Sequence, residues 1–171
     1  MASDSERAMV KDNLSAFLDM IAFSEGTAKA SDPYRVCYGY KHTIISFSDH
    51  PAVTREWTGE RLPDAMCLGA GMQPGCVSTA AGKYQIIRPT WVQCKRAAKL
   101  QDFMPASQDA AATYLLSQCG ALEDIRSGRV GSAISKAKSL WASLPGAGYS
   151  QPEQSVAALT DAFVKAGGHL A

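Results

Sequence analysis

The segment "NLSAFLDMIAFSEGT", residues 13–27, has the pattern of an amphipathic helix that stops at a glycine. Apolar side chains recur in it at the three- and four-residue spacing of one helix face, at Leu14, Phe17, Leu18 and Ile21. We expect Asp12 or Asn13 to cap the start of this helix and Gly26 to end it. Glu25 stands one turn beyond the last apolar position, beside the apolar face rather than opposite it.

Glu25 has two interpretations at this position. It is either a surface acid on a frayed helix end, which periodicity alone favours because exposed glutamates are common, or a partly buried proton donor. The unpaired carbonyls of a helix C-terminus and partial burial both oppose ionisation, so both raise the pKa of a carboxyl group. A glutamic acid that stays protonated near neutral pH is what general-acid cleavage of a glycosidic bond requires.

Composition and charge indicate a globular domain and argue against proteins that bind nucleic acid or insert into membranes. The chain of 171 residues is 46% hydrophobic and 19% charged, which predicts one globular domain, 13–171, after a flexible N-terminal tail, 1–12. Its 17 basic and 16 acidic residues give no electrostatic signature of nucleic-acid binding. No apolar run reaches the length of a membrane span, and the polar first residues do not form a secretory signal. We therefore expect no nucleic-acid partner, no stable membrane insertion and only mild dependence of activity on salt.

The five cysteines are an odd number, so at least one thiol has no partner within the chain. Cys67 and Cys76 flank the Gly- and Pro-rich loop "LGAGMQPG", whose ends can meet, and they are candidates for a local disulfide in an oxidising compartment. No C-x-x-C pair occurs, and His42, His50 and His169 follow no familiar ligand spacing. The sequence therefore predicts no metal site and no cofactor.

The rest of the chain predicts further helices around an irregular middle. From about 34 to 87, Gly, Pro and turn residues interrupt short runs such as "TIISF" and "KYQII", which is typical of a small antiparallel sheet with long loops. Helical patterns follow, and they carry Trp91 and Trp141, which we expect in the core. The predicted fold class is therefore α+β and mostly helical.

Several segments, in one order along nearly the whole chain, resemble the bacteriophage lambda endolysin family. They are "FLDMIAFSEGT" (17–27), "FSDHP" (47–51), "AAGKYQII" (80–87), "LQDFMPASQDAA" (100–111), "GAL" (120–122) and "WASLPGAGYSQ" (141–151). Members of this family are lytic transglycosylases with a lysozyme-like fold, in which a substrate cleft lies between lip loops. The resemblance implies that Glu25 is the single essential acid. By that resemblance it protonates the leaving oxygen between N-acetylmuramic acid and N-acetylglucosamine in the glycan strands of peptidoglycan.

The resemblance also implies how one acid suffices. After proton donation, the substrate's own N-acetyl oxygen stabilises the anomeric centre, and deprotonated Glu25 takes the proton of the muramic acid 6-hydroxyl, which closes a 1,6-anhydro ring. Phage muramidases that hydrolyse this bond have an acid at the ninth residue after the glutamate, where this chain has Tyr34. In "PYRV", Arg35 stands where the lambda member of the family has an acid, and we expect this change to affect the pH optimum rather than the reaction class.

Four further residues are candidate substrate contacts. The resemblance places Tyr84 and Gln85 in the stretch opposite the acid, where a ring and an amide suit sugar hydroxyls and N-acetyl groups, although Tyr84 is alternatively a core residue. Tyr149 belongs to a family loop that forms one lip of the cleft, or else it packs after a Gly-rich turn. Asp49 lies in a matched motif, but a structural turn that also involves His50 is the favoured interpretation there.

Other functions compete with this one. A hydrolytic muramidase would use Asp32 or Asp49 to activate water, and the separation of carboxylates is not visible in a sequence. A lysozyme-like module that binds glycan without cutting is disfavoured by the presence of Glu25, and a cysteine-nucleophile hydrolase is disfavoured because no cysteine has a histidine partner by motif. We expect a monomer that is made in the host cytoplasm and acts on the wall in the periplasm. Unless a leader was trimmed, its release would depend on a phage-made holin lesion.

Overall fold

The computed structural model describes residues 4–148 and 152–171, with side chains from residue 13 onward. The chain divides into two compact units, of which residues 4–26, 115–148 and 152–171 form the first and residues 27–114 form the second. The boundary falls within helix α5 (Pro105–Gln118), so one helix contributes residues to both units. A single domain over 13–171 stays a prediction.

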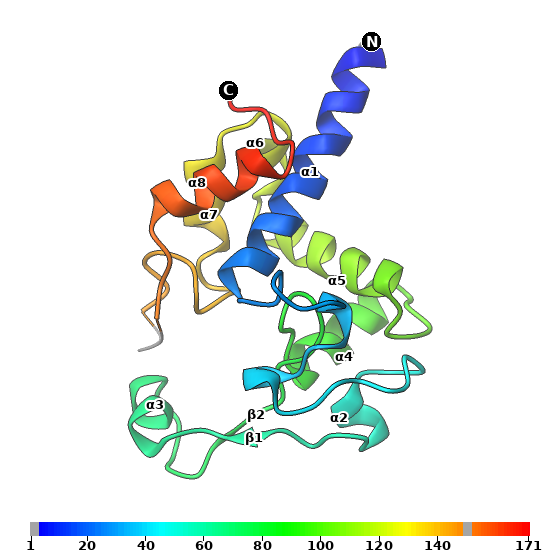
Figure 1. Ribbon diagram of the computed structural model, residues 1–171, viewed down its shortest axis with the longest axis vertical. Coiled ribbons are helices and arrows are strands. Elements are labelled where there is room, and N and C mark those ends of the chain that lie inside the picture. The colour runs from blue at the N-terminus through cyan, green and yellow to red at the C-terminus, as the bar shows by residue number, and fades with distance from the viewer. Residues whose placement is uncertain (1–3, 149–151) are drawn as a thin grey trace. The chain divides into compact units, whose positions relative to one another are not determined.

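The first unit is a group of helices packed around α1 (Asp4–Ser24) (Figure 1). Helix α1 contacts α6 (Leu122–Arg126) and α8 (Val156–Lys165), and α7 (Val130–Ala137) packs against both α6 and α8. The predicted apolar face of α1 is buried at Phe17, Leu18 and Ile21. Burial of this face against α6 and α8 is what positions the C-terminal end of α1.

The start of α1 differs from the prediction, because the helix begins at Asp4 and Asn13 lies in its interior. The buried Asn13 side chain binds distant backbone instead of a helix end. Its Nδ2 donates to Arg126 O at 3.1 Å and to His169 O at 3.2 Å, and its Oδ1 accepts from His169 N at 2.7 Å. The predicted cap at Asp12 or Asn13 is therefore wrong, since tertiary partners 113 and 156 residues away satisfy this amide. The flexibility of the segment 1–12 stays a prediction.

The second unit combines short helical elements with the predicted small antiparallel sheet. Strands β1 (Glu60–Arg61) and β2 (Val77–Ser78) pair antiparallel, with Glu60 opposite Ser78 and Arg61 opposite Val77. The helical elements are the 3₁₀ turns η1 (Pro33–Arg35) and η2 (Tyr38–Tyr40), the helices α2 (Pro51–Thr54), α3 (Asp64–Gly69) and α4 (Arg88–Ala97), and the first part of α5. The runs "TIISF" and "KYQII" contribute only isolated bridges, at Thr43 and Ile86, so the fold class is confirmed but the strands lie elsewhere.

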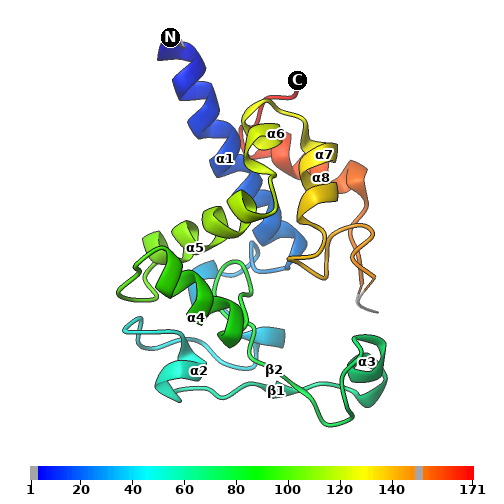
Figure 2. The ribbon, with the colours of Figure 1, turned by 180° about the vertical axis from the view of Figure 1, so that it is seen from behind.

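The core of the second unit includes the contact between α4 and α5, which lie side by side (Figure 2). Trp91 of α4 is fully buried, and its ring meets that of Phe103 edge-on, with 4.7 Å between the centroids. Cys94 of α4 lies with its Sγ 3.9 Å from Ala111 O of α5. Trp91 in this unit and Trp141 in the first are both buried, as the sequence predicts.

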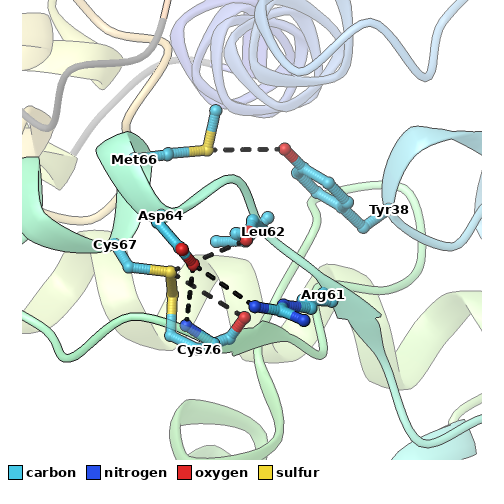
Figure 3. The surroundings of a disulfide bond; sticks show 8 residues. Tyr38, Arg61, Leu62, Asp64, Met66, Cys67 and Cys76 are labelled. Carbon is cyan, nitrogen blue, oxygen red and sulfur yellow. Dashed lines mark hydrogen bonds and ion pairs between the residues drawn. A yellow bond between two sulfur atoms is a disulfide. The ribbon is translucent and has the colours of Figure 1, made fainter.

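Cys67 and Cys76 form a disulfide that closes the loop between α3 and β2 (Figure 3). Their sulfur atoms are 2.09 Å apart and their Cα atoms 5.8 Å apart. The Asp64 carboxylate holds the same loop, because it accepts a hydrogen bond from Gly75 N at 3.0 Å (Figure 3). It also lies 3.5 Å from Arg61 Nη2, which joins α3 to β1. One disulfide and one hydrogen bond therefore fix a loop whose residues are mostly exposed.

The remaining cysteines, Cys37, Cys94 and Cys119, are free thiols. Burial raises the pKa of Cys37 to about 12 and that of Cys94 to about 11, and it also raises the pKa of Cys119. None of the three is therefore an activated thiolate at neutral pH. Within the described parts of the chain, no three His, Cys, Asp or Glu side chains group as a metal site requires. None of the described helices has both the length and the apolarity needed to cross a membrane.

Candidate functional site

Glu25 directly follows the last residue of α1 and continues its hydrogen-bond pattern. Its backbone N donates to Ile21 O at 2.8 Å, and Gly26 N donates to Phe23 O at 3.1 Å. Gly26 has a φ of 76°, the left-handed conformation that ends helices and that glycine adopts without strain. The predicted stop is confirmed, and it leaves Glu25 partly exposed at the end of a buried helix face.

Two serines form a hydrogen-bonded chain that ends on the Glu25 carboxylate. Ser143 Oγ donates to Glu25 Oε1 at 2.6 Å, and Ser24 Oγ donates to Ser143 Oγ at 2.8 Å. Because a hydroxyl has a single proton to give, this arrangement commits the proton of Ser143 to Glu25. The carboxylate is therefore oriented by a side chain that lies 118 residues away in the sequence.

Burial raises the pKa of the Glu25 carboxyl group to about 7, from an ordinary value of 4.5. Hydrogen bonds from the side chain and the backbone of Ser143 favour the ionised form and act in the opposite direction, but burial outweighs them. Near neutral pH, both the protonated and the ionised forms are therefore well populated. Such a group can give a proton in one step and accept one in the next.

In the second unit, the turn at residues 82–85 is built around the buried side chain of Gln108. Gln108 Oε1 accepts from Lys83 N at 2.9 Å, and its Nε2 donates to Tyr34 O at 3.1 Å. Gly82 has a φ of 79°, and a Cβ on it would lie 2.2 Å from Gln108 Oε1. Glycine is therefore required here both for its conformation and for the space that it leaves.

Gln85, a predicted sugar contact, uses its amide nitrogen within the protein. Its Nε2 donates to Val36 O at 3.0 Å and to Gly82 O at 2.9 Å, which occupies both amide hydrogens. Gln85 itself has a φ of 49°, so these bonds stabilise a backbone conformation that is uncommon for a residue with a side chain. Its Oε1 is the atom that would accept from a sugar hydroxyl, and this contact stays a prediction.

Tyr84 and Tyr34 share one carboxylate, that of Asp109 on α5. Both phenols donate to Asp109 Oδ1, Tyr84 at 2.6 Å and Tyr34 at 2.9 Å. Burial, together with the charge of Asp109, raises the pKa of Tyr34, so this residue stays a neutral hydroxyl. Lys83 Nζ lies 5.1 Å from the Tyr34 ring centroid, within range of a cation–π contact. Tyr84 is 1% exposed, which favours its interpretation as a core residue, and its contact with a sugar stays an untested prediction.

Asp49, another predicted substrate contact, is bound by three donors. Its Oδ1 accepts from Trp91 Nε1 and from His50 N, each at 2.8 Å, and its Oδ2 pairs with Lys95 Nζ. Burial opposes ionisation of Asp49, but the hydrogen bonds from Lys95, Trp91 and His50 outweigh burial and lower its pKa. These bonds agree with a structural role, and a sugar contact of Asp49 stays a prediction.

His50 is fully buried and has both ring nitrogens engaged. Its Nε2 lies 2.9 Å from Ile86 O, and its Nδ1 lies 3.1 Å from Ala52 N. Because a carbonyl needs a donor and a backbone N–H needs an acceptor, the ring is neutral with its proton on Nε2. Burial lowers the pKa of His50 to about 4, in keeping with this neutral form.

Asp32 and Arg35 pair across η1, with Arg35 Nε 3.1 Å from Asp32 Oδ2. Asp32 Oδ1 accepts from Tyr34 N at 3.2 Å and so caps this 3₁₀ turn. Arg35 Nη1 donates to Ile44 O at 2.7 Å, and its guanidinium lies 4.2 Å from the Phe47 ring centroid. Arg35 therefore holds the 44–47 loop against η1.

The sequence did not predict two residues that the structure places at these sites. Ser143 donates to Glu25, and Asp109 accepts from both Tyr34 and Tyr84. Each lies in a segment that resembles the family, "WASLPGAGYSQ" for Ser143 and "LQDFMPASQDAA" for Asp109. Membership of those segments is the only sequence signal for either residue. Tyr149, the remaining predicted contact, lies outside the described residues.

Comparisons with known proteins point to one family. The profile of the family described as Endolysin matches residues 15–170. The endolysin of Escherichia phage P2 is 38% identical over 156 residues, which are 91% of this chain and 93% of that protein. The endolysin of Escherichia phage lambda is 37% identical over 158 residues, 90% of each chain. Among solved structures, bacteriophage lambda lysozyme complexed with a chitohexasaccharide has a TM-score of 0.77 at 34% identity, over 94% of this chain and 97% of that one.

Proposed function

This chain belongs to the endolysin family and has its lysozyme-like fold, and on that premise we propose that it is a peptidoglycan lytic transglycosylase. It cleaves the β-1,4 bond between N-acetylmuramic acid and N-acetylglucosamine and leaves a 1,6-anhydro-muramic acid end. The main support is Glu25, a carboxyl group at the end of α1 whose pKa burial raises to about 7. The chitohexasaccharide bound to the lambda lysozyme supports a glycan as the substrate.

In the first step, protonated Glu25 gives its proton to the glycosidic oxygen as the bond from that oxygen to C1 of the muramic acid breaks. The negative charge that develops on Glu25 Oε1 turns the bond from Ser143 Oγ into a charge-assisted hydrogen bond, which is stronger than a neutral one. Ser143 therefore stabilises the ionised product of this step more than its protonated reactant. The N-acetyl oxygen of the substrate stabilises C1.

In the second step, the Glu25 carboxylate takes the proton of the muramic acid 6-hydroxyl, and O6 forms a bond to C1. Glu25 returns to its protonated form, and the 1,6-anhydro ring is closed. One C–O bond has broken and one has formed, and no water is consumed. A single group whose pKa is near neutral serves both steps, because it must be acid first and base second.

The two candidate carboxylates for a hydrolytic mechanism are engaged elsewhere in the second unit. Asp32 caps η1 and pairs with Arg35, and Asp49 binds Trp91 and Lys95. An inverting or retaining hydrolase needs a second carboxylate directed at water or at the sugar. These engagements favour the single-acid reaction over a muramidase, and sugar contacts by Gln85, Tyr84, Asp49 and Tyr149 belong to the same proposal.

Product masses test the proposal directly. Purified Gram-negative peptidoglycan is digested with the wild-type protein and with Glu25→Gln, and the released disaccharide-peptides are analysed by mass spectrometry. We expect fragments lighter by one water than the hydrolytic products, and none from Glu25→Gln. Full-mass products with a reducing end would show that water attacks, and the proposal would then give way to a muramidase. No release by the wild-type protein would indicate a module that binds glycan without cutting.

The Cys67–Cys76 disulfide supports a place of action outside the reducing cytoplasm, where such bonds persist. We propose that the protein is made in the host cytoplasm, is released through a phage-made holin lesion, and acts as a monomer on the wall in the periplasm. This is the setting that the endolysins it resembles imply.

A further inference from the structure

The second unit contains a stretch of sequence whose charged residues are all basic, a feature that the net charge of +1 conceals. Residues 65–101 include no Asp or Glu, and their basic residues are Lys83, Arg88, Lys95, Arg96 and Lys99. All but the first lie on α4 or within two residues of its end. The balance of 17 basic and 16 acidic residues over the whole chain therefore hides a local basic surface.

Helix α4 presents Arg88 and Arg96 on the side away from its buried residues. It buries Trp91 and Cys94, whereas Arg88, Val92 and Arg96, spaced four residues apart, form one exposed stripe. Lys95 is paired with Asp49. Within the described parts of the chain, neither Arg88, Arg96 nor Lys99 has an ion pair with a carboxylate.

The stripe borders two hollows in the surface of the second unit, which share Val92 and Arg96. One has a volume of about 280 Å³ and is lined in addition by Pro89, Gln93, Ala97 and Tyr114. The other has a volume of about 560 Å³ and is lined in addition by Lys95, Lys99, Leu100 and Gln101. Apolar side chains and cationic groups therefore line the same hollows, which suits a ligand with small apolar groups between carboxylates.

We infer that this α4 surface, comprising Arg88, Val92, Arg96 and Lys99, is an additional wall-binding site that takes the peptide stems of peptidoglycan. This inference rests on the proposed function. The stems carry free carboxylates, which pair with Arg96 and Lys99, and alanine methyl groups, which pack on Val92 and Pro89. A nucleic acid is the less suitable ligand, because a groove for it needs a longer run of cations and exposed aromatic rings.

Such a site would keep the enzyme on the wall between cleavage events. Two engaged sites dissociate more slowly than one, because the second rebinds at the high local concentration that the first creates. The charged contacts lie at the protein surface, so their contribution falls as salt screens them. Binding to intact wall should accordingly weaken with salt more than the net charge of the chain suggests.

The test measures binding separately from cleavage. All proteins carry Glu25→Gln, so that the wall stays intact, and they are sedimented with Gram-negative sacculi at low and high salt. The test variant adds R96Q and K99Q. The matched control adds R126Q and K165Q, which remove two exposed charges from the first unit that likewise have no ion pair among the described residues. Glycan strands freed of their peptide stems by an amidase and coupled to beads serve as the second ligand, and duplex DNA coupled to the same beads serves as the third.

We expect R96Q/K99Q to bind intact sacculi about three- to tenfold more weakly than the parent at low salt, since each surface pair contributes modestly. The control should match the parent, and all three proteins should bind the stem-free glycan strands equally. Equal binding of test and parent to intact sacculi would overturn the inference. Equal weakening in the control, or the same loss on stem-free glycan strands, would overturn it as well. A loss seen on DNA and not on sacculi would point to nucleic acid and would also overturn it.

Failure of the proposed reaction would leave a different signature. The R96Q/K99Q change in a chain that retains Glu25 should release the same anhydro products from short soluble glycan chains as the wild-type protein. If neither protein yields anhydro products, the proposed reaction is wrong, whatever the sedimentation result. If both yield them and the binding difference is absent, only the α4 site is wrong.

Discussion

Glu25 in the first unit and Asp49 in the second are both carboxylates bound by side-chain donors, yet their pKa values shift in opposite directions. The donors to the Glu25 carboxylate are neutral groups of Ser143, and burial raises the pKa of Glu25 to about 7. The Asp49 carboxylate accepts hydrogen bonds from the Lys95 ammonium group and from the Trp91 indole N–H. These bonds lower the pKa of Asp49 in spite of burial. The balance between burial and the charge and number of the donors decides which carboxyl group keeps its proton, and so which can act as an acid.

His50, next to Asp49, extends the comparison to a base. Burial lowers the pKa of its ring to about 4, and burial raises that of Glu25, because in both cases the neutral form is the one that tolerates loss of water. The neutral ring of His50 has a structural role, since both of its nitrogens form hydrogen bonds with backbone groups. In the proposed mechanism, the neutral carboxyl group of Glu25 supplies the proton that cleaves the glycosidic bond.

The largest effect is expected from Glu25→Gln, which keeps the shape of the side chain and removes its ability to exchange a proton. The rate of fragment release per folded molecule should fall about a thousandfold, the range of general acid–base catalysis. Asp49→Asn, measured beside it, should lose far less of the wild-type rate per folded molecule, because the carboxylate of Asp49 transfers no proton in the proposed reaction. Equal losses of rate in the two variants would contradict the assignment of Glu25 as the acid and of Asp49 as a structural carboxylate.

The next effect is a loss of stability in mild acid that His50 causes. Its pKa is about 4 in the folded protein against 6.5 for an ordinary histidine, so stability is complete above pH 6.5 and falls as the pH drops toward 4. At about 1.4 kcal/mol per pH unit the loss approaches ~3 kcal/mol. Urea unfolding from pH 7 to pH 4 measures it, and the His50→Gln variant should show a flatter pH dependence. An identical slope in the variant would contradict this assignment.

Asp49→Asn tests how much the hydrogen bonds of this carboxylate contribute to the stability of the fold. The change leaves Lys95 without its counter-charge and weakens the bond from Trp91 Nε1, so we expect the free energy of unfolding at pH 7 to fall by about 2 kcal/mol. Urea denaturation followed by tryptophan fluorescence measures this value. A variant as stable as the wild-type protein would show that these bonds contribute little beyond what water supplies.

The smallest effect is expected from Ser143→Ala, which removes a donor that lowers the Glu25 pKa. The pKa should therefore rise further, and the alkaline limb of the activity profile should move to higher pH. We also expect the rate at neutral pH to fall about fivefold, through loss of one hydrogen bond to the developing charge. Ser143→Thr, which keeps a hydroxyl, should restore both values, and a profile of Ser143→Ala that moves to lower pH would refute the role of this serine.

The sequence predicts the local features of α1 and misses those that depend on distant residues. The apolar spacing at Phe17, Leu18 and Ile21 and the stop at Gly26 are local, and both are confirmed. The predicted start of the helix at Asp12 or Asn13 is wrong, because the partners that satisfy the Asn13 amide are 113 and 156 residues away. The donor to Glu25 is invisible in the sequence for the same reason, since nothing local connects Ser143 with it.

In the second unit, two segments whose residue types favour strands are instead held in irregular conformations by hydrogen bonds from side chains to the backbone. The run "KYQII" has suitable residues for a strand, but Gln85 has a left-handed φ and its amide binds Val36 O and Gly82 O. The run "TIISF" is likewise held by Arg35, whose guanidinium bonds Ile44 O and lies over Phe47. A pattern of apolar residues carries no information about such bonds, so the small sheet was predicted but its strands were misplaced.

The most direct test of the central claim is a titration of the Glu25 carboxyl group itself. The protein is labelled with ¹³C at the glutamate side-chain carboxyl carbons, and the Glu25 signal is assigned by its loss in Glu25→Gln. We expect its chemical shift to titrate with a midpoint near 7, because burial outweighs the hydrogen bonds from Ser143. A midpoint near the ordinary value of 4.5 would mean that Glu25 is ionised at neutral pH, and it would contradict the role of this residue as the proton donor.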